Sequence, residues 1–212
     1  VKDPRGITTV LIVLLVISLL VDVIVLMLDF SQQVMLSRSF TEAEATANDA
    51  RQAMGGIASI IIYTATVICF CMWVHRANRN SWGFGAQGMR FTPGWAVGWY
   101  FIPFANLVKP CQSMAEIWKI SGDPVGWMHR KAGAVVATWW TLWLLSNISS
   151  NISTRLAMRA ENIDQLQTST VASMISGGFG IASAVGAIFL VRGVYRRQVA
   201  LVRGSRDAGD AV

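Results

Sequence analysis

The sequence predicts an all-α integral membrane protein, a four-transmembrane-helix bundle with a re-entrant or interfacial helical element on its cytoplasmic side. Three observations carry this prediction. Only 14% of the 212 residues are charged, whereas about 25% are charged in a typical soluble domain. The apolar residues, 53% of the chain, gather in four long blocks. The lysines and arginines are concentrated between alternate blocks and at the two ends of the chain.

The four apolar blocks predict the membrane spans. Each block is 19 to 22 residues long, and about 20 helical residues cross the hydrocarbon layer. None shows the polar stripe that a helix of a soluble bundle carries. The first block is also longer than the apolar core of a signal peptide. We therefore expect one transmembrane domain over 1–212, with spans at about 7–28, 53–74, 132–150 and 171–191, a re-entrant or interfacial element at 91–120 and a polar C-terminal tail at 192–212.

The distribution of lysine and arginine predicts the orientation of these spans. With both termini in the cytoplasm, 14 of the 18 basic residues lie on the inner side and 4 lie outside. This asymmetry is what the positive-inside rule requires. If the fifth apolar stretch, 91–108, also crossed the membrane, the count would become 7 inside and 11 outside. We therefore expect four spans, with both termini cytoplasmic in the inner membrane.

The fifth apolar stretch is interrupted by residues that break a helix. It contains Pro93, Pro103 and Asn106 among its apolar residues. Irregular backbone at membrane depth is tolerated only where protein buries it or where it lines a cavity. The stretch also carries Trp95 and Trp99, and tryptophan favours the headgroup boundary. We expect it to enter and leave on the cytoplasmic side, as a re-entrant hairpin or as an interfacial helix pair.

A short helix is expected directly after this stretch. Pro110 suits the first turn of a helix. Apolar residues share one face of 111–120, which is the pattern of an amphipathic helix. It either lies on the inner leaflet or docks onto the bundle, and both arrangements are compatible.

Basic residues near the inner ends of the spans predict contact with anionic lipid. Each such cation adds about 1 kcal/mol of attraction to an anionic leaflet. The expected partners are anionic headgroups, with a second copy of the chain or another membrane protein as further partners, and the pI of about 9.7 requires no nucleic acid. The candidate functional segment consists of Arg76, Arg79, Arg90, Pro93, Trp95, Trp99, Pro103, Asn106 and Pro110.

Asp22 is the only ionisable residue inside a predicted span. An intramembrane acid indicates a functional site by default, because it is costly at the centre of a helix. Asp22 lies past the midpoint of its span, where that cost is lower, and Asp29 follows one heptad later on the same face. Asp22 is therefore a candidate intramembrane acid, and packing without a function is the alternative.

Two other patterns, a glycine motif and a set of cysteines and histidines, do not indicate a chemical site. Gly83, Gly85 and Gly88 match a dinucleotide-binding pattern, but no strand precedes them and no acid follows about 20 residues later. Three cysteines and two histidines lack the spacing of a zinc site. We expect no catalytic, cofactor or metal site and no enzyme activity.

The cytoplasmic stretch also carries a family resemblance. It reads WVHRANRN at 73–80, GMRFTPGWAVGWYFIPFANLVKP at 88–110 and EIW at 116–118. These runs resemble the domain of unknown function 4328 family of bacterial multi-span membrane proteins, over roughly residues 54–200. Cys111 departs from the aromatic residue typical of relatives. The resemblance implies a bacterial inner membrane and supplies no activity.

Together these observations favour a non-enzymatic bacterial inner-membrane protein. Its Trp/Pro-rich cytoplasmic-side segment is expected to engage lipid or a protein partner. The alternative is a small transporter or channel subunit, in which the broken segment lines a cavity and Asp22 assists.

Overall fold

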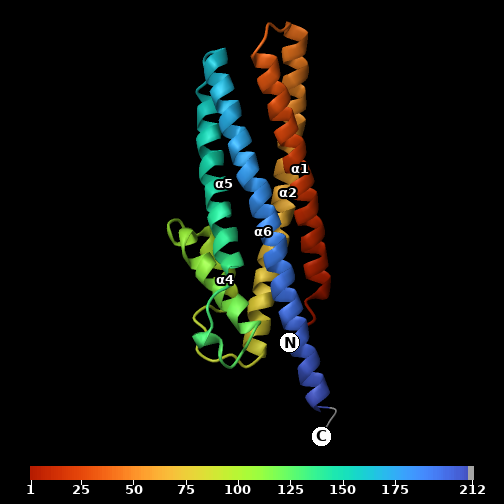
Figure 1. Ribbon diagram of the computed structural model, residues 1–212, viewed down its shortest axis with the longest axis vertical. Coiled ribbons are helices and arrows are strands. Elements are labelled where there is room, and N and C mark those ends of the chain that lie inside the picture. The colour runs from red at the N-terminus through yellow and green to blue at the C-terminus, as the bar shows by residue number, and fades with distance from the viewer. Residues whose placement is uncertain (210–212) are drawn as a thin grey trace. The chain divides into compact units, whose positions relative to one another are not determined.

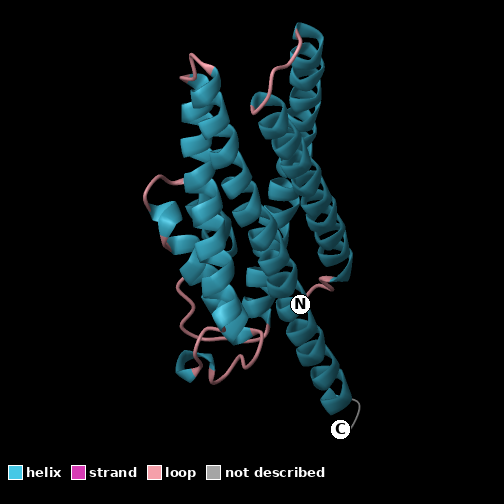
Figure 2. Cartoon of the chain, turned by 45° about the horizontal axis from the view of Figure 1, so that its top comes forward, coloured by secondary structure: helices cyan, strands magenta, loops and turns pink. Residues whose placement is uncertain are grey.

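Helices account for most of the chain. The computed structural model describes residues 1–209, and side chains through residue 204. It is 82% helical, and the described residues contain no strand (Figure 2). The all-α prediction is therefore confirmed. The elements follow one another (Figure 1) as α1 (Arg5–Leu36), α2 (Glu42–Gly83), α3 (Pro93–Gly98), η1 (Trp99–Phe101), η2 (Ala105–Leu107), α4 (Lys109–Ile120), η3 (Trp127–His129), α5 (Ala134–Met158) and α6 (Ile163–Gly209).

The long helices extend well beyond the predicted spans. α2 begins at Glu42, 11 residues before the predicted start at residue 53, and α6 continues to Gly209. The predicted tail at 192–212 is thus helical as far as residue 209, and residues 210–212 lie outside the described residues. Hydropathy marks the apolar part of a helix, whereas polar flanks that favour helix extend it further.

Three helices are long and apolar enough to cross a membrane: α1, α2 and the described part of α6. α5 is not among the helices that meet this standard, and its sequence contains three tryptophans and several serines and asparagines. Many large apolar side chains are exposed along the three apolar helices, as a lipid-facing surface requires. Examples are Val10, Val13, Leu20, Ile24, Met27, Ile57, Ile60, Ile61, Ile68, Ile175 and Phe189.

Contacts divide the chain into two compact units. The first unit comprises Val1–Val13, Thr66–Trp140 and α6 from Gly186 onward. The second unit comprises Leu14–Ala65 and Thr141–Val185. The whole 91–120 segment therefore belongs to the first unit, and Asp22 belongs to the second.

A buried amide organises the helices of the first unit. Gln198 on α6 is almost fully buried, and its Nε2 donates to the carbonyl of Ala77 at 3.1 Å and to Ser121 Oγ at 3.2 Å. Its Oε1 accepts from Asn80 Nδ2 at 3.2 Å. Buried polar groups that are fully hydrogen-bonded fix a unique arrangement of their elements. Gln198 thereby ties α6 to α2 and to the end of α4.

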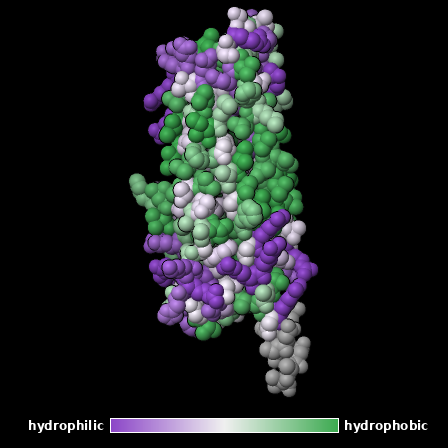
Figure 3. All heavy atoms as spheres, viewed as in Figure 1, coloured by the Kyte–Doolittle hydropathy of each residue, from purple (hydrophilic) through white to green (hydrophobic). Residues whose placement is uncertain are grey.

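Four helical segments make up the second unit. α1 and α2 pack together here, since a Cβ on Gly55 would lie 3.0 Å from Leu28 Cδ1. α1 also contacts α6, where Gln32 Nε2 donates to Thr170 Oγ1 at 2.8 Å. Figure 3 shows hydrophilic residues gathered at the end of this unit where the loops join α1 to α2 and α5 to α6. On the same face, hydrophobic residues cover the helices next to these loops.

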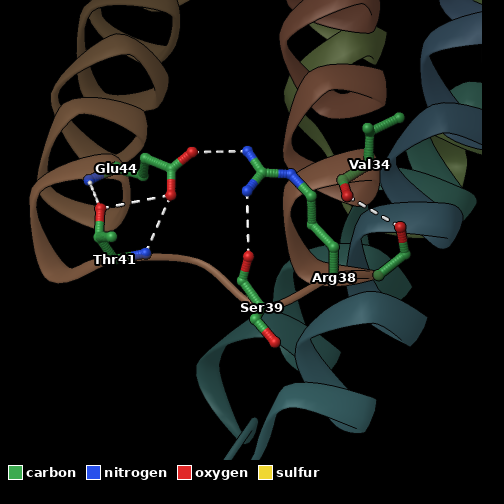
Figure 4. Close-up of polar contacts among 6 residues, drawn as sticks. Val34, Arg38, Ser39, Thr41 and Glu44 are labelled. Carbon is green, nitrogen blue, oxygen red and sulfur yellow. Dashed lines mark hydrogen bonds and ion pairs between the residues drawn. The ribbon is translucent and has the colours of Figure 1, made fainter.

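The loop between α1 and α2 forms a reciprocal cap on α2 (Figure 4). The backbone N–H of Thr41 donates to Glu44 Oε2 at 2.9 Å, and the N–H of Glu44 donates to Thr41 Oγ1 at 3.3 Å. This is a capping box, which satisfies donors that a helix leaves open at its start. Arg38 Nη2 also pairs with Glu44 Oε1 at 2.6 Å, and the interaction holds the pKa of Glu44 at about 2.

Candidate functional site

The 91–120 segment folds as two short helices joined by two turns of 3-10 helix. Thr92 caps α3, because its Oγ1 accepts from the N–H of Trp95 at 3.5 Å, and Pro93 stands in the first turn. Phe104, after Pro103, has a φ of 63°, which is costly for a residue with a side chain. The expected break in the helical backbone is thus present.

An aromatic cluster fixes this segment to α2 and α5 within the first unit. The ring of Tyr100 lies 6.0 Å from the ring of Phe70 and 6.2 Å from that of Trp140, edge to face in both cases. Trp140 Nε1 also donates to the carbonyl of Leu107 at 3.0 Å. Edge-to-face pairs add about 0.5–1.5 kcal/mol beyond burial. Trp140 and its neighbour Trp139 are buried.

The outer edge of the segment is apolar and exposed. Phe104 is 85% exposed and Phe101 is 66% exposed. The exposed apolar edge comprises Phe101, Ile102, Phe104, Leu107 and Val108. A patch of this kind marks a surface that meets lipid or another protein.

A pocket of about 220 Å³ opens in the same segment. Trp95 and Trp99 form one wall, with ring centroids 4.9 Å apart. Lys109 Nζ lies 5.8 Å from the ring centroid of Trp99, within the range of a cation–π interaction. We call it the tryptophan pocket, and it is lined by Arg90, Phe91, Trp95, Trp99, Lys109 and Gln112.

A buried carboxylate positions Arg90 at this pocket. Glu116 is 2% exposed, and its Oε1 accepts from Arg90 Nε at 2.9 Å. The backbone N–H of Arg90 also approaches the two carboxylate oxygens at 3.4 and 3.3 Å. The Arg90 side chain itself is 66% exposed. Glu116 therefore orients the guanidinium while leaving most of it open to a ligand.

The pocket combines positive charge with aromatic surface. Arg90 and Lys109 contribute two cations, and Glu116 offsets one of them. Guanidinium and ammonium groups bind phosphate oxygens, and indole rings pack against apolar chains at the membrane boundary. The arrangement suits an anionic amphiphile.

The structure brings only part of the predicted segment together. Arg90, Trp95 and Trp99 line the tryptophan pocket. Pro93, Pro103 and Pro110 shape its backbone: Pro93 and Pro110 open α3 and α4, and Pro103 lies between η1 and η2. Asn106 lies in η2 and is half-buried. Arg76 and Arg79 lie on α2, where Arg76 is half-buried and Arg79 is exposed. None of these three residues lines the pocket.

Sequence reasoning missed Glu116, Lys109 and Gln112 as site residues. Glu116 lies off the apolar face of 111–120, a position that favours solvent in an isolated helix, yet it is buried against Arg90. One signal was available. Glu116 is the first acid after Asp49 in a stretch that contains several cations, and a lone acid among cations is a signal for a counter-ion.

Asp22 and Asp29 occupy the second unit, in a polar interior. Asp29 is 7% exposed, and its Oδ2 accepts from Ser173 Oγ at 2.7 Å. Asp22 is half-buried. One of its oxygens lies 3.8 Å from the point where a Cβ on Gly180 would stand, and Ser146 Oγ lies 3.5 Å from the same point. Ser146 on α5 thus lies near Asp22.

No group of three or more His, Cys, Asp or Glu side chains that could hold a metal ion occurs in the described residues. The three cysteines, Cys69, Cys71 and Cys111, are free thiols. The glycines of the 83–88 pattern form the turn after α2, where Gly85 and Gly88 have φ of 80° and 74°.

Comparison with protein families identifies the chain. The model for the domain of unknown function DUF4328 matches residues 37–196. The chain belongs to this family. The match includes the 91–120 segment and all residues of the tryptophan pocket. Searches of curated proteins and of solved structures found no match, so this DUF4328 protein inherits no activity from a named relative.

Proposed function

We propose that this DUF4328 protein is a non-enzymatic protein of the bacterial inner membrane that engages anionic lipid through its 91–120 segment. In this proposal the chain spans the membrane four times, α5 included, and both termini are cytoplasmic. The segment then lies at the inner headgroup layer. A protein partner on the same surface, including a second copy of the chain, is the competing occupant.

The tryptophan pocket beside the exposed apolar edge carries the proposal. Lys109 and Arg90 supply charge for a phosphate group. Phe101 and Phe104 supply apolar surface that would lie among acyl chains. One ligand class satisfies both requirements at once, because an anionic phospholipid joins a phosphate to a hydrocarbon chain. Each juxtamembrane cation is worth about 1 kcal/mol towards such a leaflet.

Quenching by brominated lipid tests the proposal. The full chain would be reconstituted in bilayers that contain brominated phosphatidylglycerol or brominated phosphatidylcholine at equal mole fraction. We expect stronger tryptophan quenching by the anionic lipid, with the excess removed by Trp95→Phe together with Trp99→Phe. Lys109→Gln should reduce the selectivity about fivefold. Lys119→Gln is the matched control, because Lys119 is on the same helix and does not line the pocket.

Equal quenching by both lipids in the wild-type chain would overturn lipid engagement and favour a protein partner. An equal loss in Lys119→Gln would show that diffuse charge, and not the pocket, attracts the lipid. The sidedness has its own test, in which Val125→Cys, at a residue that is 96% exposed in the loop after α4, is placed in a chain with its native cysteines replaced. An impermeant maleimide should label it from the cytoplasmic side only.

A small transporter or channel subunit is the second candidate. Asp22, which is half-buried, and Asp29, which is buried, favour it, because intramembrane carboxylates near hydroxyl and amide groups can accept a proton or a cation. Proteoliposomes of the purified chain would be assayed for movement of H⁺, Na⁺ and K⁺. Flux that is lost in Asp22→Asn would support this candidate, and the absence of flux would refute it.

A further inference from the structure

A second pocket, of about 350 Å³, lies in the first unit and shares no residue with the tryptophan pocket. It is formed where α4 ends, where the turn after η3 passes and where α6 runs alongside. We call it the arginine pocket, and it is lined by Ser121, Gly122, Arg130, Arg197, Ala200 and Leu201.

Two guanidinium groups converge in the arginine pocket. A Cβ on Gly122 would lie 3.6 Å from Nη1 of Arg197 and 3.8 Å from Nη1 of Arg130. Glycine has no Cβ, so this space between the two groups is left open. The carbonyl oxygen of Lys119 lies 3.4 Å from the same point and already accepts from the N–H groups of Gly122 and Asp123. Two like charges lie near this point, and an anion bound there would reduce their mutual repulsion.

Arg197 is held in place before any ligand arrives. Its guanidinium carbon lies 3.8 Å from the ring centroid of Trp118, and its Nη1 donates to the carbonyl of Trp118 at 3.2 Å. The Trp118 ring in turn packs against two glycines, since a Cβ on Gly193 would lie 2.6 Å from its Cζ3, and Gly133 meets the ring similarly. A donor fixed in this way loses little side-chain entropy on binding.

The charges around the pocket do not cancel. Asp123 pairs with Arg130, with 3.3 Å between Oδ2 and Nε, and its Oδ1 accepts from the N–H of Gly126 at 2.9 Å. Among the side chains that the structure describes, Arg130 thus has a carboxylate partner, whereas no carboxylate lies within ion-pair distance of Arg197. The buried Ser121 hydroxyl, which also lines the pocket, accepts from Gln198 Nε2 at 3.2 Å.

From this geometry we propose that Arg130 and Arg197 bind a phosphate oxyanion over Gly122. Guanidinium groups present paired N–H donors that match the oxygens of a phosphate, and two of them on one anion give charge-assisted bonds from both sides. The phosphate belongs either to a phospholipid headgroup or to a small soluble phosphate ester. The two sources share this chemistry and are separated by experiment.

Binding of two probes to the full chain tests the site. Inorganic phosphate would be titrated into the purified protein in a neutral detergent by calorimetry. Phosphatidylglycerol would be compared with phosphatidylcholine by native mass spectrometry of retained lipid. Arg197→Lys and Arg130→Gln should each weaken the affinity for the binding probe about tenfold, because each loses charge-assisted hydrogen bonds. Gly122→Ala should weaken it while retaining both arginines, and its Cβ meets only ordinary van der Waals distances.

Arg196→Gln is the matched control. Arg196 is exposed on the same helix and does not line the pocket, so the variant removes one charge and leaves the site intact. Phosphate binding that survives this change but not the other three supports the proposal and identifies a soluble source. Selective retention of phosphatidylglycerol with the same pattern identifies a lipid source.

Two results would overturn the site. One is that neither probe binds to the wild-type chain. The other is that Arg196→Gln weakens binding as much as Arg130→Gln, which would assign the effect to general charge. Either result leaves the tryptophan pocket untouched, because its quenching assay depends on Trp95, Trp99 and Lys109.

Discussion

Glu116 offers the sharpest test of how the tryptophan pocket is built. Replacing it with alanine removes a 2%-exposed carboxylate that accepts from Arg90 Nε at 2.9 Å and approaches the backbone N–H of Arg90. Lost hydrogen bonds of a charged group cost about 1.5–3 kcal/mol, and the lost buried methylene contacts add about 1 kcal/mol. The exposed Arg90 guanidinium regains water, so the ion pair itself adds under about 1 kcal/mol. We expect a total loss of about 3 kcal/mol.

Glu116→Gln separates the charge from the shape of the side chain. Glutamine keeps the volume and one acceptor oxygen for Arg90, so the expected loss is about 1 kcal/mol. The measurement is unfolding by sodium dodecyl sulfate in mixed micelles, followed by circular dichroism. Hydrogen exchange of residues 84–92 supplies a local readout and should become faster in Glu116→Ala.

The matched control for this series is Glu161→Ala, since Glu161 is exposed and lies outside the first unit. A loss below about 0.5 kcal/mol in Glu116→Ala, with unchanged exchange at 84–92, would refute the reasoning. The pocket would then be held by its aromatic contacts alone.

Two further predictions concern a close packing contact and a titrating cap. Gly193→Ala would place a Cβ 2.6 Å from Trp118 Cζ3, so thermal unfolding should show a loss of about 1–3 kcal/mol; an unchanged midpoint would contradict this packing. Arg38 holds the pKa of Glu44 at about 2 in the folded protein, whereas the pKa in the unfolded chain is about 4.3. The ionised Glu44 side chain therefore stabilises the folded protein fully above about pH 4.3. This contribution is lost as the pH falls towards 2. The difference in unfolding midpoint between wild type and Glu44→Gln should shrink across that window, and a constant difference would contradict it.

The existence of the helices follows from local sequence, whereas their ends do not. The apolar blocks predicted α1, α2, α5 and α6, and the breakers Pro93 and Pro103 predicted the irregular stretch between α2 and α4. The predicted spans do not give the helix ends, because a helix continues through polar residues until a cap or breaker stops it. Thr41 and Glu44 form such a cap at the start of α2. Hydropathy does not locate this cap, because it measures only how apolar a segment is.

The pockets could not be predicted from the sequence, because their partners are far apart along the chain. Arg90 and Glu116 are 26 residues apart. Trp118 and Arg197 are 79 residues apart. Periodicity reports which residues share a face of one helix, but it contains no information on which face of another helix they meet.

By itself the sequence determined that this chain is helical, that its composition is typical of a membrane protein and that it belongs to the DUF4328 family. Composition, the length of the apolar blocks and the motifs are all properties of the linear chain. Only the tertiary structure decided that Glu116 holds Arg90 and that Arg130 and Arg197 face each other over Gly122. The physical reason is that burial and pairing of charge depend on how helices pack, and small side chains decide how closely they approach.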